Sequence, residues 1–340
     1  MDYTSDNQWK QVQYKRLDNS RLIASHFTGH GVMNCCKKIK SANLKLRINS
    51  EGKAYYDGLL KCHSVWDCPY CSGIISTKRR KEIGIALLTW AEAKGKVKLI
   101  TYTVKHNKSD RLKDLQNVIN EAYRFSKSGS TYQKLKKEYK IKGSIVANEI
   151  NYSDDFGWHY HRHEIVFYNS DQDFKHFEDV IYKRYYSKLS ELGFSSLPGI
   201  GVNVSEREGA LSTYLSKWGL DNELTSIKDS NSRTPFQLLD ELANEDDLGL
   251  FLEYSKTMKG KRRLTWSNGL KDFFGIDEIS DEDITEEEQN SDDLIITTIT
   301  KKEWDYILQN SLYLKVLEVA GSPGIDFYSW WCDNVSSLVT

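Results

Sequence analysis

Histidine recurs at every second position from residue 159 to residue 163, and the apolar run Ile165 to Phe167 follows at once. Residues i, i+2 and i+4 of a β-strand lie on one face, so the pattern predicts a strand with His159, His161 and His163 on one side. Neighbouring members would lie about 7 Å apart at Cα, and the outer two about 13 Å apart. Two neighbours can therefore bind one ion, whereas the outer two cannot without bending the strand.

A third ligand for such an ion would come from the neighbouring strand. Residues 145–150 are predicted to form that strand, and a turn through residues 153–157 joins it to the histidine strand. Glu149 is the natural candidate on it. A single strand histidine is usually a hydrogen-bonded or surface residue, but three at alternating positions beside a carboxylate favour metal binding. Such a set suits Mn²⁺, Mg²⁺ or another divalent ion that binds phosphate oxygens, although histidine also suits Zn²⁺.

The surrounding sequence predicts an α+β fold in which helices pack on an antiparallel sheet. Short β-branched and aromatic segments predict strands, and longer segments with helical spacing predict helices. The strands are expected at residues 97–104, 145–150, 158–168 and 199–204. The helices are expected at residues 72–94, 111–139 (in two pieces, broken near residue 129), 171–192, 205–218 and 301–319. The central part of this order is β-α-β-β-α-β.

Five of the six cysteines lie within 37 residues of one another. Without a secretion signal, clustered thiols more often hold a metal than form disulfides. Cys68 and Cys71 have the spacing of a zinc knuckle, and Cys62 is a third ligand. One of Cys35 or Cys36 supplies the fourth, with Cys36 favoured; His63 competes but is awkwardly placed beside Cys62. The helix after this knuckle is expected to start only at Ser72.

Tyr214 and Lys217 are three residues apart on a predicted helix, so both can address the same phosphate. A phenol with a pKa near 10 is a weak nucleophile and needs a metal to polarise the phosphate and a cation to favour the phenolate. The spacing alone is weak evidence, because the chain has 20 tyrosines. Its weight comes from following the histidine strand.

The net charge is −1, but ten acidic residues lie within residues 277–293, where no Lys or Arg occurs, which leaves +9 on the rest of the chain. This acidic segment is expected to be a solvated linker, and the remaining charge is compatible with a polyphosphate partner. A second charged segment comprises Lys259, Lys261, Arg262 and Arg263, beside Trp266. It is either a solvated face or a grip on a nucleic-acid strand by charge and stacking.

These features predict five parts. They are an N-terminal arm (1–34), a zinc knuckle with its helix (35–95), a domain that carries the histidine strand and, in its C-terminal part, the basic segment (96–275), an acidic linker (276–293) and a tail of no assigned role (294–340). No run approaches the roughly 18 apolar residues that span a membrane. The N-terminus is polar, so we expect a cytoplasmic protein with no membrane partner.

Several motifs in one order resemble the plasmid and phage rolling-circle replication initiators of the HUH endonuclease superfamily. They are CHSVWDCPYC (Cys62 to Cys71), TYTV, GWHYHRHEIVF, YLSKW, TPFQLL and GKRRLTWSNGL, which together span roughly residues 35–275. The resemblance implies the HUH endonuclease fold, with a ferredoxin-like or RRM-like antiparallel sheet flanked by helices and an N-terminal zinc-binding knuckle. It also implies a site-specific single-strand DNA nickase and strand transferase.

In that resemblance, His161 and His163 are the metal-binding pair, with Glu149 and possibly His159 beside them, and Mn²⁺ or Mg²⁺ is the catalytic ion. Tyr214 would attack a phosphate of the origin DNA, leaving a 5′-phosphotyrosyl link and a free 3′-OH, while Lys217 steadies the phosphate. Thr101 and Thr103 would lie in the strand beside the active site. The implied partners are single-stranded origin DNA and a host helicase and polymerase.

Two positions depart from the family pattern. Arg162 occupies the middle of the His-x-His pair, which is often apolar, but it should face away from the metal. Ala210 occupies the position of a glutamate that activates water when replication terminates. Glu206 lies about two helical turns from Tyr214, and Glu208 is nearer but lies on a different helical face from Tyr214. The departure therefore affects termination and not the first cut.

Three alternatives fit parts of the sequence. An HUH transposase or mobilisation relaxase would use the same chemistry on another DNA site. A non-catalytic, zinc-stabilised DNA-binding regulator would use the histidines as a second structural site, but it would not need Tyr214 with Lys217. A histidine/carboxylate metal oxygenase would fit the histidine pair but would leave the cysteine knuckle unexplained.

Overall fold

The computed structural model describes residues 3–25, 31–40, 44–197, 200–204, 232–240, 245–286 and 293–339, with only the backbone at residues 3–11, 13 and 245. The chain forms two compact units. One comprises Met1–Ile75 with Ser280–Thr340, and the other comprises Ser76–Ile279. Both are mixed α/β, and helix α2 (Pro69–Glu92) crosses the boundary between them.

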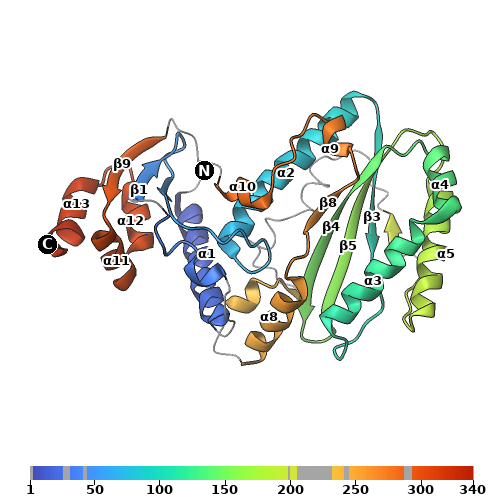
Figure 1. The fold of residues 1–340 in the computed structure, drawn as a ribbon, viewed down its shortest axis with the longest axis horizontal. Helices are drawn as coiled ribbons and strands as arrows, with labels where there is room; N and C mark the ends of the chain where they lie inside the picture. Colours follow the sequence, from blue (N-terminus) through green and yellow to red (C-terminus); the bar gives the residue numbers. More distant parts are fainter. Residues whose placement is uncertain are drawn as a thin grey trace. The chain divides into compact units, whose positions relative to one another are not determined.

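The second unit is built on a curved antiparallel sheet (Figure 1). Its strands are β3 (Lys96–Tyr102), β4 (Gly143–Ser153), β5 (Gly157–Tyr168), β6 (Val202–Val204), β7 (Ser232–Arg233) and β8 (Leu264–Trp266). They run in the order β6-β3-β5-β4-β7, and β8 also pairs with β4. The four strands expected from the sequence are therefore present, and the β4–β5 hairpin is the longest pairing in the described part.

Three helices complete the expected order. They are α3 (Leu112–Ser126), α4 (Gly129–Glu138) and α5 (Lys175–Glu191). The sequence β3-α3-α4-β4-β5-α5-β6 is the predicted β-α-β-β-α-β, and the predicted break near residue 129 separates α3 from α4. Helix α3 buries Leu112, Leu115, Ile119 and Ala122, which recur every three to four residues. The same unit contains η2 (Gln237–Leu239), α8 (Glu245–Met258) and α9 (Leu270–Phe273).

The two faces of this sheet are covered differently. On one face, Glu164 of β5 accepts hydrogen bonds from Tyr102 of β3 (2.9 Å) and Tyr123 of α3 (3.1 Å). On the other face, Ile165 and Phe167 join a buried apolar cluster with residues of α2 and α9. His159, His161 and His163 follow on this second face by the alternation of β5, beyond that cluster.

Helix α2 begins earlier than the sequence predicted. It starts at Pro69 instead of Ser72, because proline is tolerated at the first helical position, where its missing N–H would have no partner. At the other end of the helix, Gly95 lies against the indole ring of Trp90. A Cβ on Gly95 would lie 2.2 Å from that ring, so a larger residue could not make this turn.

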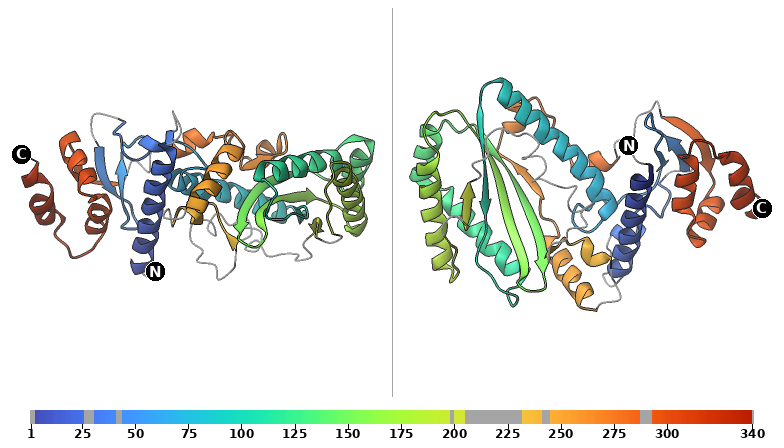
Figure 2. Two further views of the ribbon diagram at one scale, coloured as in Figure 1. Left: turned by 90° about the horizontal axis from the view of Figure 1, so that it is seen from below. Right: turned by 180° about the vertical axis from the view of Figure 1, so that it is seen from behind.

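The first unit contains α1 (Tyr3–Ala24), η1 (Gly31–Asn34) and a three-stranded antiparallel sheet. The sheet has the order β2 (Ala54–Asp57), β1 (Leu44–Ile48), β9 (Leu294–Ile299). Its further helices are α10 (Asp281–Glu286), α11 (Lys301–Gln309), α12 (Tyr313–Ala320), α13 (Phe327–Asn334) and η3 (Ser336–Leu338). In Figure 2 the blue strands of this sheet lie beside the orange-red β9. No helix in the described ranges is both long and apolar enough to cross a membrane.

The C-terminal segment differs from the separate tail that the sequence suggested. Strand β9 pairs with β1 from Leu44 opposite Ile299 to Ile48 opposite Leu294, so the segment completes a sheet begun near the N-terminus. A long-range pairing of this kind leaves no local signal. The single helix expected at 301–319 is divided into α11 and α12, because Ser311 takes a left-handed conformation with φ 55°.

Part of the acidic segment is also folded rather than a solvated linker. Residues 281–286 form α10, in which Ile284 and Thr285 are buried. Glu286 forms an ion pair with Lys40, and Lys61 donates a hydrogen bond to the Thr285 carbonyl. An apolar anchor and two lysines therefore overcome the mutual repulsion of the carboxylates at this point.

Loss of the buried Lys127 ammonium should strongly destabilise the second unit. Lys127 lies 2.8 Å from the Glu164 carboxylate, and their side chains are 8% and 1% exposed. Lys127→Met would leave a buried charge without its cation, which costs about 3–5 kcal/mol. Urea unfolding followed by circular dichroism would measure the loss. Lys175→Met, which breaks the exposed pair with Asp179, should leave the midpoint nearly unchanged; equal shifts would contradict the role given to the buried pair.

Two candidate metal sites

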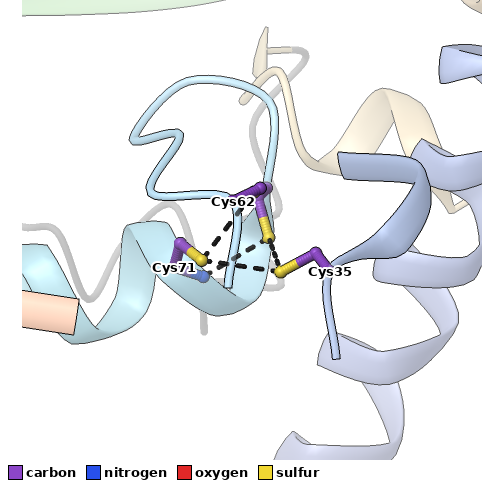
Figure 3. A group of neighbouring side chains, drawn as sticks. Cys35, Cys62 and Cys71 are labelled. Atoms are coloured by element: carbon purple, nitrogen blue, oxygen red, sulfur yellow. Dashed lines mark hydrogen bonds between the residues drawn. The ribbon is translucent and has the colours of Figure 1, made fainter. Parts of the chain in front are cut away.

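Four cysteine thiols of the first unit meet at one point. Cys35 follows η1, Cys62 lies in the loop after β2, and Cys68 and Cys71 bracket the start of α2. The sulfur of Cys35 is 3.6 Å from those of Cys68 and Cys71, and the sulfurs of Cys62 and Cys71 are 3.8 Å apart. Figure 3 shows the side chains of Cys35, Cys62 and Cys71 pointing toward one another.

This spacing fits a tetrahedral zinc ion. With Zn–S bonds of about 2.3 Å, the sulfurs of a regular tetrahedron lie about 3.8 Å apart. Cys35, Cys68 and Cys71 are each 0% exposed, and burial raises the pKa of the Cys68 thiol. Buried thiolates at this density repel one another, so a cation is what would stabilise them together. The start of α2 and the Cys71 N–H, 3.4 Å from the Cys68 sulfur, add partial positive charge.

Cys35 is the fourth member of this group, and the preference for Cys36 was wrong. The Cys36 backbone is left-handed, with φ 55°, and its N–H donates to the Leu60 carbonyl. Its side chain instead lines a cavity of about 380 Å³ with Tyr14 and Arg21. His63 is not a member of the four-thiol group either, and its Nδ1 instead lies 2.5 Å from the Thr285 hydroxyl.

The second group lies on the sheet of the other unit. The antiparallel register places Glu149 of β4 opposite His161 of β5, and Ala147 opposite His163. The Glu149 Oε2 and His163 Nε2 atoms are 2.7 Å apart, and the His161 and His163 rings have centroids 6.0 Å apart. Ligand atoms of Glu149, His161 and His163 all lie within 4.8 Å of one another. The structure thus brings together the carboxylate and the histidine pair that the sequence singled out.

Neighbouring side chains orient these groups. Thr101 of β3 lies opposite His163, and its hydroxyl is 2.9 Å from His163 Nδ1. Asn151 donates from Nδ2 to the Glu149 Oε1 atom at 3.1 Å. Metal-bound histidines and carboxylates usually carry such hydrogen bonds on their outer side. The arrangement is therefore that of a built ligand set.

The protonation states suit a divalent cation. Burial would raise the pKa of Glu149, but the hydrogen bond and charge of His163 and the charge of His161 outweigh it and lower that pKa to about 2. Burial lowers the pKa of His161 to about 4, against the opposing charge of Glu149. The carboxylate is then ionised and the His161 imidazole neutral near pH 7, which are the forms that bind metals.

His159 is not part of this ligand group in the described structure. Its Nδ1 lies 3.0 Å from Nε2 of His106, a residue of the loop after β3. Sequence reasoning missed His106, because an isolated histidine 53 positions away carries no spacing signal.

The basic segment only partly matches its expected role. Lys259, Lys261 and Arg262 are exposed, whereas Trp266 packs against the buried cluster under α2 and α9. Trp266 is thus not an open stacking platform, since β8 pairs with β4 and places Trp266 opposite Ile145. Tyr214, Lys217 and Ala210 lie outside the described residues.

Two curated proteins are similar to part of this chain. One is the neomycin resistance protein of Streptomyces cyanogenus, 32% identical over 139 residues, which cover 34% of this chain and 32% of that protein. The other is Protein rep of Streptomyces lividans, 29% identical over 135 residues, which cover 32% of this chain and 30% of that protein. The chain thus spans about a third of each relative's length. No protein-family model and no solved structure matches the chain.

The two adjacent cysteines give a direct test of the zinc site. We expect the purified protein to contain about one equivalent of zinc per chain by mass spectrometry of the metal. Cys35→Ser should abolish zinc binding, whereas Cys36→Ser should retain it. Of these two cysteines, only Cys35 belongs to the four-thiol group. Zinc lost from Cys36→Ser and kept in Cys35→Ser would reverse the assignment.

Proposed function

We propose that this protein is a rolling-circle replication initiator that nicks single-stranded origin DNA of a plasmid or phage through a tyrosine. The observation that carries the proposal is the grouping of Glu149, His161 and His163 on one face of an antiparallel sheet. Two imidazole nitrogens and one carboxylate can hold a divalent cation, and the carboxylate suits Mn²⁺ or Mg²⁺. Such an ion, when bound, polarises a phosphate oxygen.

The chain path supports Tyr214 as the nucleophile. Strand β6 ends at Val204, and its Asn203 lies opposite Thr101, which in turn lies opposite His163. Asn203 is therefore two strand spacings, roughly 10 Å, from His163. Tyr214 follows Val204 by ten residues, and ten residues reach at most about 36 Å. The chain returns to the same sheet at Ser232, opposite Ser153 of β4.

In the proposed reaction, the Tyr214 oxygen attacks a DNA phosphorus held beside His161, His163 and Glu149. The new O–P bond forms as the bond from phosphorus to the 3′ oxygen breaks. The products are a 5′-phosphotyrosyl link and a free 3′-OH from which a host polymerase can extend, with a host helicase separating the strands. Lys217, three residues after Tyr214, would offset the phosphate charge.

Further support comes from the remaining features. One of the two partial relatives is named Protein rep, and the shared segment covers only part of either chain. The four-thiol group fits a structural zinc ion that fixes the start of α2. Exposed Lys259, Lys261 and Arg262 would contact DNA phosphates. We propose that the protein acts in the cytoplasm, where its DNA substrate lies.

Replacement of the nucleophile should abolish covalent capture of DNA. With single-stranded origin DNA and Mn²⁺, the wild-type protein should form an adduct that survives denaturing electrophoresis, and Tyr214→Phe should form none. Tyr186→Phe, which removes the hydroxyl of an exposed tyrosine on α5, is the matched control and should form the adduct normally. An undiminished adduct in Tyr214→Phe would refute the nucleophile. Absence of any adduct from the wild type, with DNA binding retained, would favour a zinc-stabilised DNA-binding regulator.

Loss of one metal ligand should separate cutting from binding. His163→Ala should reduce adduct formation by more than the ~10–100-fold typical for loss of an outer partner of a metal ligand, while DNA affinity by fluorescence anisotropy stays close to wild type. His176→Ala, at an exposed position on α5, is the control. Full cutting by His163→Ala would exclude this residue as a ligand.

A further inference from the structure

His106 links the loop after β3 to the tip of the β4–β5 hairpin. Its Nδ1 lies 3.2 Å from the backbone oxygen of Phe156, and its Nε2 lies 3.0 Å from Nδ1 of His159. His159 in turn precedes His161 by two residues on the same strand face, with ring centroids 6.2 Å apart. A chain of polar contacts therefore runs from a fixed backbone carbonyl toward the proposed cation site.

The carbonyl sets the direction of every hydrogen bond in this chain. An oxygen of that kind only accepts, so Nδ1 of His106 carries the proton. A neutral imidazole then has its lone pair on Nε2, and Nδ1 of His159 must donate to it. Nε2 of His159 is left with a lone pair. The 3.0 Å contact between Nε2 of His106 and Nδ1 of His159 has room for one proton only, so one of these two nitrogens must accept.

We infer that His106 is a positioning residue of the cation site, which holds His159 in the tautomer whose Nε2 lone pair faces a divalent cation or a water bound to it. The inference rests on the proposed function, because it needs a cation at His161 and His163. It assigns a role to the third histidine of the strand, which is too far from the ligand group to belong to it directly. It also adds a residue from a different element.

The loop that carries His106 is built to make this contact. Asn107 and Asp110 fix its turn, with the Asn107 N–H donating to the Asp110 carboxylate at 2.8 Å. The loop packs directly on Gly157 at the hairpin tip, where φ is +77°. A Cβ on Gly157 would lie 2.8 Å from the Cα of Lys108, so only glycine allows the loop to approach this closely. The contact between His106 and His159 therefore depends on Gly157.

Titration of the zinc-loaded full-length protein with Mn²⁺ in a calorimeter tests the role of His106. His106→Phe should weaken Mn²⁺ binding by ~10–100-fold, as is typical when a side chain that orients the surroundings of a metal site is lost. His106→Gln should recover part of the affinity, because its amide can donate to the Phe156 carbonyl and accept from His159. His176→Phe should bind as the wild type does.

Wild-type affinity in His106→Phe would overturn the inference and leave the proposed function intact. Absence of Mn²⁺ binding to the wild type would instead remove the proposed cation site and the inference with it. Melting curves would establish that each variant is folded.

Substitutions at two glycines distinguish the effect of loop packing on Mn²⁺ binding from the effect of backbone strain. Gly129 also has positive φ, +72°, but nothing lies within 4 Å of the position of its Cβ. Gly157→Ala should weaken Mn²⁺ binding to the same degree as His106→Phe, whereas Gly129→Ala should not. Equal effects of the two substitutions would attribute the loss to strain and contradict the loop contact.

Discussion

Glu149 lies directly opposite His161 in the antiparallel pairing of β4 with β5, and the chemistry of this sheet depends on that pairing. A slip of one residue would turn every side chain of β5 to the other face. The histidines would then meet the buried Tyr102 and α3, and the Glu164 carboxylate would meet the apolar cluster. Both faces therefore enforce the same register, one by its apolar cluster and the other by the Glu164–Lys127 ion pair.

This redundancy explains why the sheet and its carboxylate–histidine group could be predicted from sequence. Alternation and β-branched content are local, and the strand period of two fixes which side chains share a face. Glu149 followed from its place on the strand before the turn, where a carboxylate could complete the site. Cys35, His106 and the segment after Leu294 could not be chosen in this way. The first depends on the backbone angle of Cys36, and the others on contacts between residues more than 50 positions apart.

The two candidate sites would bind their ions for different physical reasons. Three of the four thiols are buried, and each thiolate would oppose the ionisation of the others, so a zinc ion there would contribute to folding. The ligands on the sheet are instead held by protein hydrogen bonds, from Asn151 to Glu149 and between Thr101 and His163. Such a site is oriented before a cation arrives, which suits an ion that must also hold a phosphate.

The Thr101 hydroxyl can hydrogen-bond to His163 both with and without a cation bound at Nε2. The ionised Glu149 accepts a hydrogen bond, so Nε2 of His163 carries a proton and, in the neutral ring, Nδ1 accepts from the Thr101 hydroxyl. A cation at Nε2 needs the lone pair of that nitrogen, so the single proton of the neutral ring must move to Nδ1, which must then donate. A hydroxyl can accept as readily as it donates, by rotation of its hydrogen. A backbone carbonyl in this place could only accept, and a valine could do neither. Threonine therefore permits the proton to move from Nε2 to Nδ1, as binding of a cation at Nε2 requires.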